Sequence, residues 1–214
     1  ACVGMRGTGA AVTMEVLVRI GRRDDPETVT LHVQSISEWA PPCIGPYAQT
    51  VCDAGILHIC GVLPLYAPTV SIPKDLGARA QTRAALFNMC RTLEATPGSF
   101  KDVRVFVVYL VAESIADAVE DEVRTSYAAF HGQPFRGIIA LIPVDSLPKN
   151  ALVEIRAVAA VDRMDRGTPV VDLELGVQIQ KLGYRLIEIY SVDNPEGVTS
   201  YISAQLEDTA VLSA

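Results

Sequence analysis

The sequence predicts an α+β fold in which a β-sheet carries two long helices on one face, with extra strands toward both ends of the chain. Two observations predict it. Strand-like runs fall into groups, and one helix-like stretch lies between successive groups, at 75–95 and after Ser114. One strand-like run, 103–111, is apolar on both faces, which is typical of a central strand covered from both sides.

The segments before the first helix read as strands separated by proline-rich loops. Residues 29–36 alternate, a short strand is expected near 49–52, and 56–63 follow a turn signal at 53–55. Three prolines exclude a regular element over 39–47, and prolines also break 63–73 into a loop.

Both helices show an apolar stripe. In 75–95, which is rich in Ala, Leu and Arg, the stripe is followed by a stop signal at 97–98. In the second helix Ser114 and Asp117 predict a capping box. The buried stripe of this helix is expected to comprise Ile115, Val119, Val123 and Tyr127.

Two apolar strands follow, 137–144 and 151–161, and the connection "DSLPKN" predicts that they pair as a hairpin. Residues 162–169 read as a linker, and 12–20, 170–179 and 184–192 alternate like further strands. We therefore expect an N-terminal extension over 1–34, a central domain over 35–161 and a C-terminal extension over 162–214.

Composition excludes several classes of function. The net charge of −7 argues against nucleic-acid binding, and no run approaches the roughly 20 apolar residues of a membrane helix. The start of the sequence has no signal-peptide pattern. Five cysteines without C-x-x-C spacing and three scattered histidines predict free thiols in a reducing cytoplasm, with no metal site. Nucleotide-binding glycine motifs are absent, so no cofactor is expected.

Two charged residues stand out near and within the last two strands. Arg136 follows a proline at a strand start, where a guanidinium can clamp a carboxylate or pair with a structural carboxylate. Glu154 lies inside an apolar strand. On a packed sheet face its pKa would be raised and it could hold a water; alternatively it shares a solvated row with Arg156.

A turn and a strand end supply further candidates. In "GPYAQ", Tyr47 offers an aromatic wall and a hydroxyl, or simply packs. Cys60 and Gly61 end a strand where a ligand could approach the backbone, or where the strand forms a bulge.

These fragments occur together in one known family. The ordered run "GPYAQ", "ICG", "FNM", "GSFKDVRVFVVYLV", "SYAAF", "PFRG" and "LPKNALVEIRAVA" resembles the YjgF/RidA family, also called endoribonuclease L-PSP, from about 35 to 161. The resemblance implies a chorismate-mutase-like fold, a homotrimer, and ligand clefts between subunits. It also implies hydrolysis of enamines and imines to 2-keto acids and ammonia.

The resemblance implies roles for the candidate residues. Arg136 would bind the substrate carboxylate, Glu154 would orient the water, Tyr47 would line the cleft, and the strand at Cys60 and Gly61 would give backbone contacts. The sequence departs from the active pattern at three further cleft positions: Gly137 and Ile138 replace small hydroxyl or thiol residues, and Arg124 replaces an asparagine.

A second, more specific resemblance suggests an alternative function. "VQSISEWAPPCIGPYAQ" and "LPLYAPTVSIP" look like the second RidA-like domain of eukaryotic diphthine–ammonia ligases. The alternatives are thus an imine or enamine deaminase, and a non-catalytic binding or assembly domain beside an ATP-dependent ligase domain in a longer chain. The acidic balance and the lack of a histidine pair argue against a ribonuclease.

Overall fold

The structure is a computed structural model that describes residues 28–53, 55–161, 184–186 and 204–206. The chain divides into two compact units, Ala1–Val161 and Asp162–Ala214. In the described part of the second unit, β7 (Tyr184–Leu186) and β8 (Ala204–Leu206) pair antiparallel. The predicted strands at 12–20 and 170–179 lie outside the described residues, and β7 falls within the predicted strand 184–192.

The first unit contains one six-stranded sheet with the order β1-β2-β3-β6-β4-β5. Its helices are α1 (Ala78–Leu93) and α2 (Ala116–His131), and the short 3-10 turns are η1 (Phe100–Asp102), η2 (Glu113–Ile115) and η3 (Pro148–Asn150). The strands are β1 (Val29–Leu31), β2 (Thr50–Asp53), β3 (Ile56–Val62), β4 (Val103–Leu110), β5 (Ile138–Pro143) and β6 (Val153–Ala160). Each strand predicted between 35 and 161 is therefore present. β1 lies in the predicted N-terminal extension, pairs with β2, and is shorter than the expected run 29–36.

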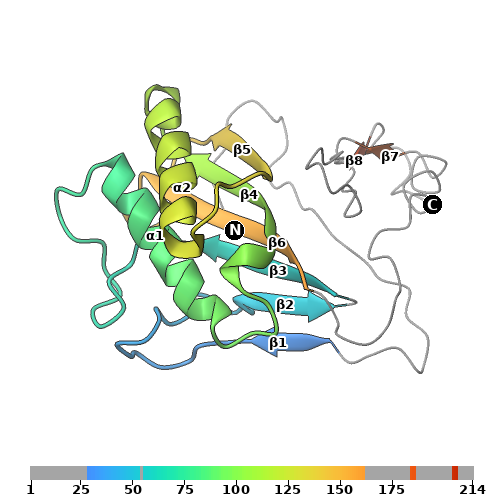
Figure 1. Cartoon of the computed structure of the whole chain (residues 1–214). Coiled ribbons are helices and arrows are strands. Elements are labelled where there is room, and N and C mark those ends of the chain that lie inside the picture. The colour runs from blue at the N-terminus through green and yellow to red at the C-terminus, as the bar shows by residue number, and fades with distance from the viewer. Residues whose placement is uncertain (1–27, 54, 162–183, 187–203, 207–214) are drawn as a thin grey trace, which may run out of the picture. The chain divides into compact units, whose positions relative to one another are not determined.

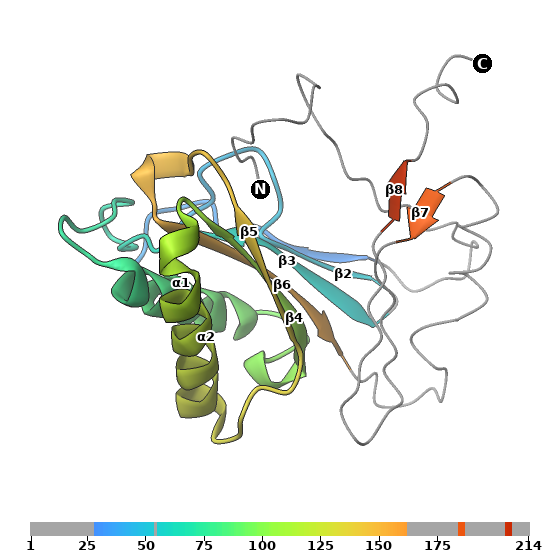
Figure 2. The same cartoon turned by 90° about the horizontal axis from the view of Figure 1, so that it is seen from above.

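Both helices lie against the same face of this sheet, as predicted (Figure 1; Figure 2 shows the view from above). Between the helices and the sheet lies the main core, which includes Phe106 and Leu110 of β4 and three of the four residues of the predicted stripe. Val119 and Val123 are fully buried, Tyr127 is 4% exposed, and Ile115 packs at the border of the core. The helical periodicity therefore identified the packed face of α2 correctly.

The predicted pairing of the last two strands is wrong. β5 pairs in parallel with β4, β6 pairs antiparallel with both β4 and β3, and β5 does not neighbour β6. The turn after β5 reverses the chain, but β4 fills the position between the two strands. Because β4 is apolar along nearly its whole length, a central position buries more of it than an edge position would.

The predicted capping box at Ser114 does not form. α2 follows η2 directly, its N-cap is Ile115, and no side chain caps it. A capping box forms instead before β4, where Asp102 Oδ2 accepts hydrogen bonds from Ser99 N at 2.8 Å and Ser99 Oγ at 2.7 Å. This box fixes the start of the central strand.

A buried carboxylate ties α1 to α2. The side chain of Glu122 is 3% exposed, and it accepts hydrogen bonds from Arg83 at 2.8 and 3.1 Å and from Ser126 at 2.8 Å. Burial by itself would raise the pKa of Glu122, but these hydrogen bonds outweigh it and the pKa lies below its usual value. The ion pair between Arg83 of α1 and Glu122 of α2 therefore joins the two helices.

No helix among the described residues has the length and apolar character needed to cross a bilayer. Among the described cysteines, Cys43, Cys60 and Cys90 are free thiols.

Candidate functional site

A hydrogen-bonded turn presents Tyr47. The thiol of Cys43 donates to the carbonyl oxygens of Gly45 at 3.1 Å and Tyr47 at 3.0 Å, and Tyr47 N donates to Gly45 O at 2.9 Å. A Cβ at Gly45 would meet the Tyr47 ring at 2.9 Å, so glycine lets the ring lie over the turn. The motif "GPYAQ" thus fixes the aromatic ring locally.

Cys60 and Gly61 lie at an irregularity of β3. The register between β3 and β6 shifts between Ile59 and Val62, which matches the bulge alternative for this position. Cys60 N donates to Gln49 O at 2.9 Å, which joins the bulge to the segment after Tyr47. The bulge therefore places the Cys60 side chain and the turn next to each other.

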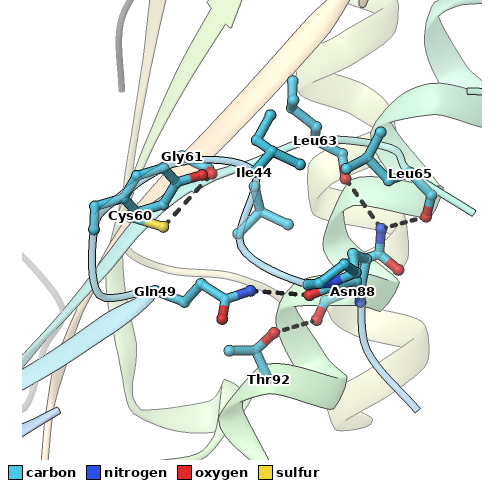
Figure 3. Close-up of a pocket in the computed structure, with 12 residues that line it drawn as sticks. Ile44, Gln49, Cys60, Gly61, Leu63, Leu65, Asn88 and Thr92 are labelled. Atoms are coloured by element: carbon cyan, nitrogen blue, oxygen red, sulfur yellow. Dashed lines mark hydrogen bonds between the residues drawn. The ribbon is translucent and has the colours of Figure 1, made fainter. Parts of the chain in front are cut away.

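These two segments and α1 enclose a small pocket (Figure 3). Its wall contains Tyr47, Cys60 and Gly61, three of the residues predicted from the sequence. The remaining lining residues are Pro41, Pro42, Ile44, Gln49, Val62, Leu63, Leu65, Asn88 and Thr92.

Glu154 is the buried acid of the site. Its neighbours Val153 and Ile155 are fully buried in the helix-side core, so Glu154 points to the opposite sheet face. Its side chain is only 3% exposed, and Oε2 has no hydrogen-bond partner in the part of the chain that the structure describes. This burial favours the packed interpretation of Glu154 over a solvated row with Arg156.

The electrostatics link Glu154 to the pocket. Burial raises the pKa of Glu154 above its usual value. Burial, then Cys43, then Glu154 raise the pKa of Cys60 to about 12. Burial is also the largest cause of the raised pKa of Tyr47, to which Cys60, Cys43 and Glu154 contribute. Tyr47 and Cys60 therefore stay protonated at neutral pH and face an acid with an unpaired oxygen.

Arg136 lies away from this group within one chain. It is exposed and directly precedes Gly137 and β5, at the sheet edge. Ile138 is in register with Val105 and Val158, four residues from Glu154 along β6. Four residues span roughly 13 Å, and the intervening β4 adds about 10 Å across the sheet. A small ligand cannot contact Arg136 and Glu154 of the same chain.

Gly137 occupies a position that admits no side chain. A Cβ there would lie 2.1 Å from the carbonyl oxygen of Arg104 and 2.5 Å from the ring of Phe135. Close packing against Arg104 and Phe135 therefore leaves no room at position 137 for a side chain with a hydroxyl or thiol.

Arg124 lies on the exposed side of α2. Its guanidinium donates to Glu120 Oε1 at 3.0 and 2.8 Å, and the side chain is 47% exposed. This ion pair on one helix accounts for the residue inside a single chain. Its role in ligand binding stays a prediction.

Several pocket residues escaped the sequence analysis. Asn88 donates through Nδ2 to the carbonyl oxygens of Leu63 at 3.0 Å and Leu65 at 2.9 Å, which shapes the loop after β3. Gln49 accepts from Val33 N at 2.7 Å and donates to Pro41 O at 3.0 Å. An amide inside an apolar helical stripe was the available signal for Asn88.

The fold and this site define a RidA-type α+β domain. The family model described as endoribonuclease L-PSP matches residues 37–161, and the chain belongs to this family. A RutC family protein of Pyrococcus horikoshii is 37% identical over 124 residues, covering 58% of this chain and 93% of that protein. The crystal structure of the YjgF gene product of Escherichia coli superposes with a TM-score of 0.54 at 26% identity, covering 63% of this chain and 99% of that one.

Two relatives bear on function. A 2-iminobutanoate/2-iminopropanoate deaminase of Escherichia coli is 30% identical over 126 residues, which are 58% of this chain and 93% of that protein. A diphthine–ammonia ligase of Schizosaccharomyces pombe is 32% identical over 136 residues, which are 61% of this chain and 21% of the ligase.

Proposed function

We propose that the domain binds a small 2-oxo or 2-imino carboxylate and hydrolyses enamine or imine intermediates to 2-keto acids and ammonia. The observation that carries the proposal is Glu154, which is 3% exposed, has no hydrogen-bond partner for Oε2 among the described residues, and contributes to the raised pKa of Tyr47 and of Cys60. A buried acceptor without a partner costs stability unless a ligand or water fills it. The similarity to an iminobutanoate deaminase supports the same chemistry.

The chemistry follows from the groups present. Glu154 holds a water by accepting a hydrogen bond and takes a proton as the water oxygen attacks the imine carbon. That proton passes to the imine nitrogen, which gives a tetrahedral carbinolamine. The hydroxyl of the carbinolamine then loses its proton, which Glu154 transfers to the amino group; the carbonyl forms as the carbon–nitrogen bond breaks, and ammonia and a 2-keto acid leave. The raised pKa of Glu154 brings the acid closer to the pH at which it both accepts and returns this proton.

We expect this activity to be weak. Gly137 and Ile138 supply no hydroxyl or thiol beside Arg136, so only backbone groups can fix the reacting water there. Loss of one positioned polar partner commonly lowers the rate on the order of 10²–10³-fold. Binding of the carboxylate does not depend on that partner.

Arg136 enters this site from a neighbouring subunit in the same proposal. The separation between Arg136 and Glu154 along the sheet excludes a shared ligand within one chain. A homotrimer with clefts between subunits would bring the guanidinium of one copy to Glu154 of the next, since a heterologous ring contact joins two different surfaces. The guanidinium would clamp the carboxylate through two parallel hydrogen bonds.

A mixing experiment tests this proposal. Arg136→Ala and Glu154→Gln proteins are each assayed for benzoate or pyruvate binding and for keto-acid formation from an enamine made in place by an amino-acid oxidase. Each variant should be inactive alone. When the two are unfolded together and refolded at equal amounts, about one quarter of the clefts should combine an intact Arg136 with an intact Glu154.

Four outcomes count against the proposal or one of its parts. No recovery in the mixture places both residues outside a shared site. Undiminished anion binding by Arg136→Ala would show that another group binds the carboxylate. Anion binding that is retained in Arg136→Lys would show that a positive charge suffices without the planar guanidinium. Light scattering that shows a monomer at micromolar concentration would contradict the contribution of Arg136 by a neighbouring subunit.

A second function is favoured by the partial match to a diphthine–ammonia ligase. In this alternative the domain is a non-catalytic binding or assembly part of a longer chain, beside an ATP-dependent ligase domain. The complete reading frame distinguishes the two, because a ligase domain upstream would support the alternative. A cytoplasmic setting fits both candidates, since Cys43, Cys60 and Cys90 are free thiols that a reducing compartment preserves.

A further inference from the structure

The starts of β4 and β5 place two arginines side by side. β5 runs parallel to β4, and Ile138 lies opposite Val105. Arg104 therefore lies opposite Gly137, and Arg136 is only one residue further along. A Cβ on Gly137 would collide with the carbonyl oxygen of Arg104, so the two strand starts pack closely. Neighbouring strands are roughly 5 Å apart and one residue adds about 3 Å, which puts the Cα atoms of the two arginines about 6 Å apart.

Both side chains leave the backbone on the sheet face that is turned away from the helices. Phe135 is buried in the helix-side core, so the next residue, Arg136, points away from that core. Val103 points into the same core, and the register between β4 and β6 shifts directly after it. Arg104, at this bulge, therefore starts on the opposite face, to which Glu154 also points.

The guanidinium of Arg104 is anchored through a single nitrogen. Its Nη1 donates to the carbonyl oxygen of Lys101 at 3.0 Å and to that of Val103 at 3.5 Å. The hydroxyl of Tyr127 donates to the same Lys101 oxygen at 3.4 Å. Nε and Nη2 of Arg104 form no hydrogen bond with another described residue. The anchor therefore fixes the guanidinium at the start of β4 and leaves two of its three nitrogens for a ligand.

The charges of these two arginines have no carboxylate partner in the part of the chain that the structure describes. Ion pairs with carboxylates do form at Arg79, Arg83, Arg91 and Arg124. Asp102, the acid next to Arg104 in sequence, accepts hydrogen bonds from Ser99 instead. Lys101 is exposed and adds a third positive charge close to the start of β4. This end of the sheet therefore has an excess of positive charge that an anion with two separate negative groups would balance.

We infer that Arg104 is a second anion-binding residue of the proposed site, and that this site takes 2-oxo and 2-imino dicarboxylates in preference to monocarboxylates of the same length. Arg136 binds the carboxylate next to the reacting carbon, and Arg104 binds the distal carboxylate through Nε and Nη2, the pair of donors that suits a bidentate contact. The inference rests on the proposed function, because it assumes that Arg136 binds the substrate carboxylate.

Calorimetric titration of the full chain tests the inference with two acids that differ only at one end. 2-Oxoglutarate carries a second carboxylate where 2-oxopentanoate carries a methyl group. A hydrogen-bonded contact with a charged group raises affinity on the order of 10- to 100-fold, and partial exposure of Arg104 keeps the effect at the lower end. We therefore expect 2-oxoglutarate to bind on the order of 10-fold more tightly than 2-oxopentanoate.

Two glutamine variants make a matched pair. Arg104→Gln should bring the ratio of the two affinities to about one, because the distal carboxylate loses its partner. Its affinity for 2-oxopentanoate should stay close to the wild-type value, which also shows that the variant is folded. Arg79→Gln removes the same charge from an exposed position on α1, where Arg79 pairs with Asp121, and it should keep the wild-type ratio.

The outcomes separate the inference from the proposed function. A ratio near one in the wild type, an unchanged ratio in Arg104→Gln, or an equal fall of the ratio in Arg79→Gln would overturn the inference. Binding of 2-oxopentanoate in any of these cases would leave Arg136 as the group that binds the first carboxylate. If neither acid binds to the wild type, the inference and the proposed function both fail.

Discussion

Placing a serine at position 137 should destabilise the domain strongly, although a hydroxyl beside Arg136 is what an efficient deaminase site would call for. The nearest atoms to an added Cβ are the backbone oxygen of Arg104 at 2.1 Å and the Phe135 ring at 2.5 Å. Phe135 is 6% exposed, so its ring has little room to turn. Neither neighbour is the free end of a flexible side chain.

The size of the effect follows from this overlap. Extra atoms in a packed region cost about 1–3 kcal/mol, and a clash with backbone belongs at the upper end. With a urea m-value of about 2 kcal/mol per molar, 3 kcal/mol lowers the unfolding midpoint by roughly 1.5 M. Trp39 is the single tryptophan of the chain and can report unfolding by fluorescence.

Gly77→Ser is the matched control. Gly77 is the N-cap of α1, it has φ −68°, and nothing lies within 4 Å of its Cβ position. Serine is favoured at an N-cap, so this variant should be neutral or slightly more stable. Equal midpoints for Gly137→Ser and Gly77→Ser would refute the packing argument. Keto-acid formation that rises in a fully stable Gly137→Ser protein would refute it as well.

Three further predictions follow from buried polar groups. Glu122→Ala should lower stability by about 1 kcal/mol or more near neutral pH, because it leaves the buried Ser126 hydroxyl unpaired, while the exposed Arg83 adds little. The folded pKa of Glu122 is depressed, so the part of the difference that depends on the charged carboxylate should be present above the unfolded pKa and be lost as pH falls through the folded pKa. A difference in thermal scans that stays constant with pH would contradict this. Glu154→Gln should stabilise the domain increasingly as pH rises, because burial raises the folded pKa of Glu154 and the wild type must bury a charge above it; a melting difference independent of pH would exclude this burial effect. Asn88→Ala should cost roughly 2–4 kcal/mol in urea unfolding, since two carbonyl oxygens lose their shared donor, and a loss below about 0.5 kcal/mol would show that water replaces the amide.

The parts of the fold that local periodicity controls were predictable. The buried stripe from Val119 to Tyr127, and the run over 103–111 that is apolar on both faces, can each be recognised from residues close together in the sequence. Strand pairing is different, because "DSLPKN" turns the chain without specifying which strand lies next to β6. That choice depends on where β4 buries most surface, which is a tertiary property.

The candidate site divides along the same line. Glu154 was visible because one carboxylate interrupts an apolar strand, and the turn with Tyr47 was visible in a short motif. Asn88 and Gln49 were not, since their partners lie 25 and 16 residues away in the chain. Hydrogen bonds between distant loops leave no periodic signal.

In the proposed function, the position of Glu154 reflects its need for a ligand. A sequence selected for stability alone would place an aliphatic residue there. The carboxylate is buried with one oxygen that has no partner in the described part of the chain, while its neighbours Val153 and Ile155 complete the core without it. Structures keep such local violations where they are functional. Arg136 differs from Glu154, because its charge is exposed at the far sheet edge and destabilises a single chain little. In the proposed function, a second copy that supplies Arg136 together with an anion would give both residues a partner. Assembly and ligand binding are therefore expected to stabilise one another: a carboxylate ligand should shift a monomer–trimer equilibrium toward the trimer in wild type and leave it unchanged in Arg136→Ala.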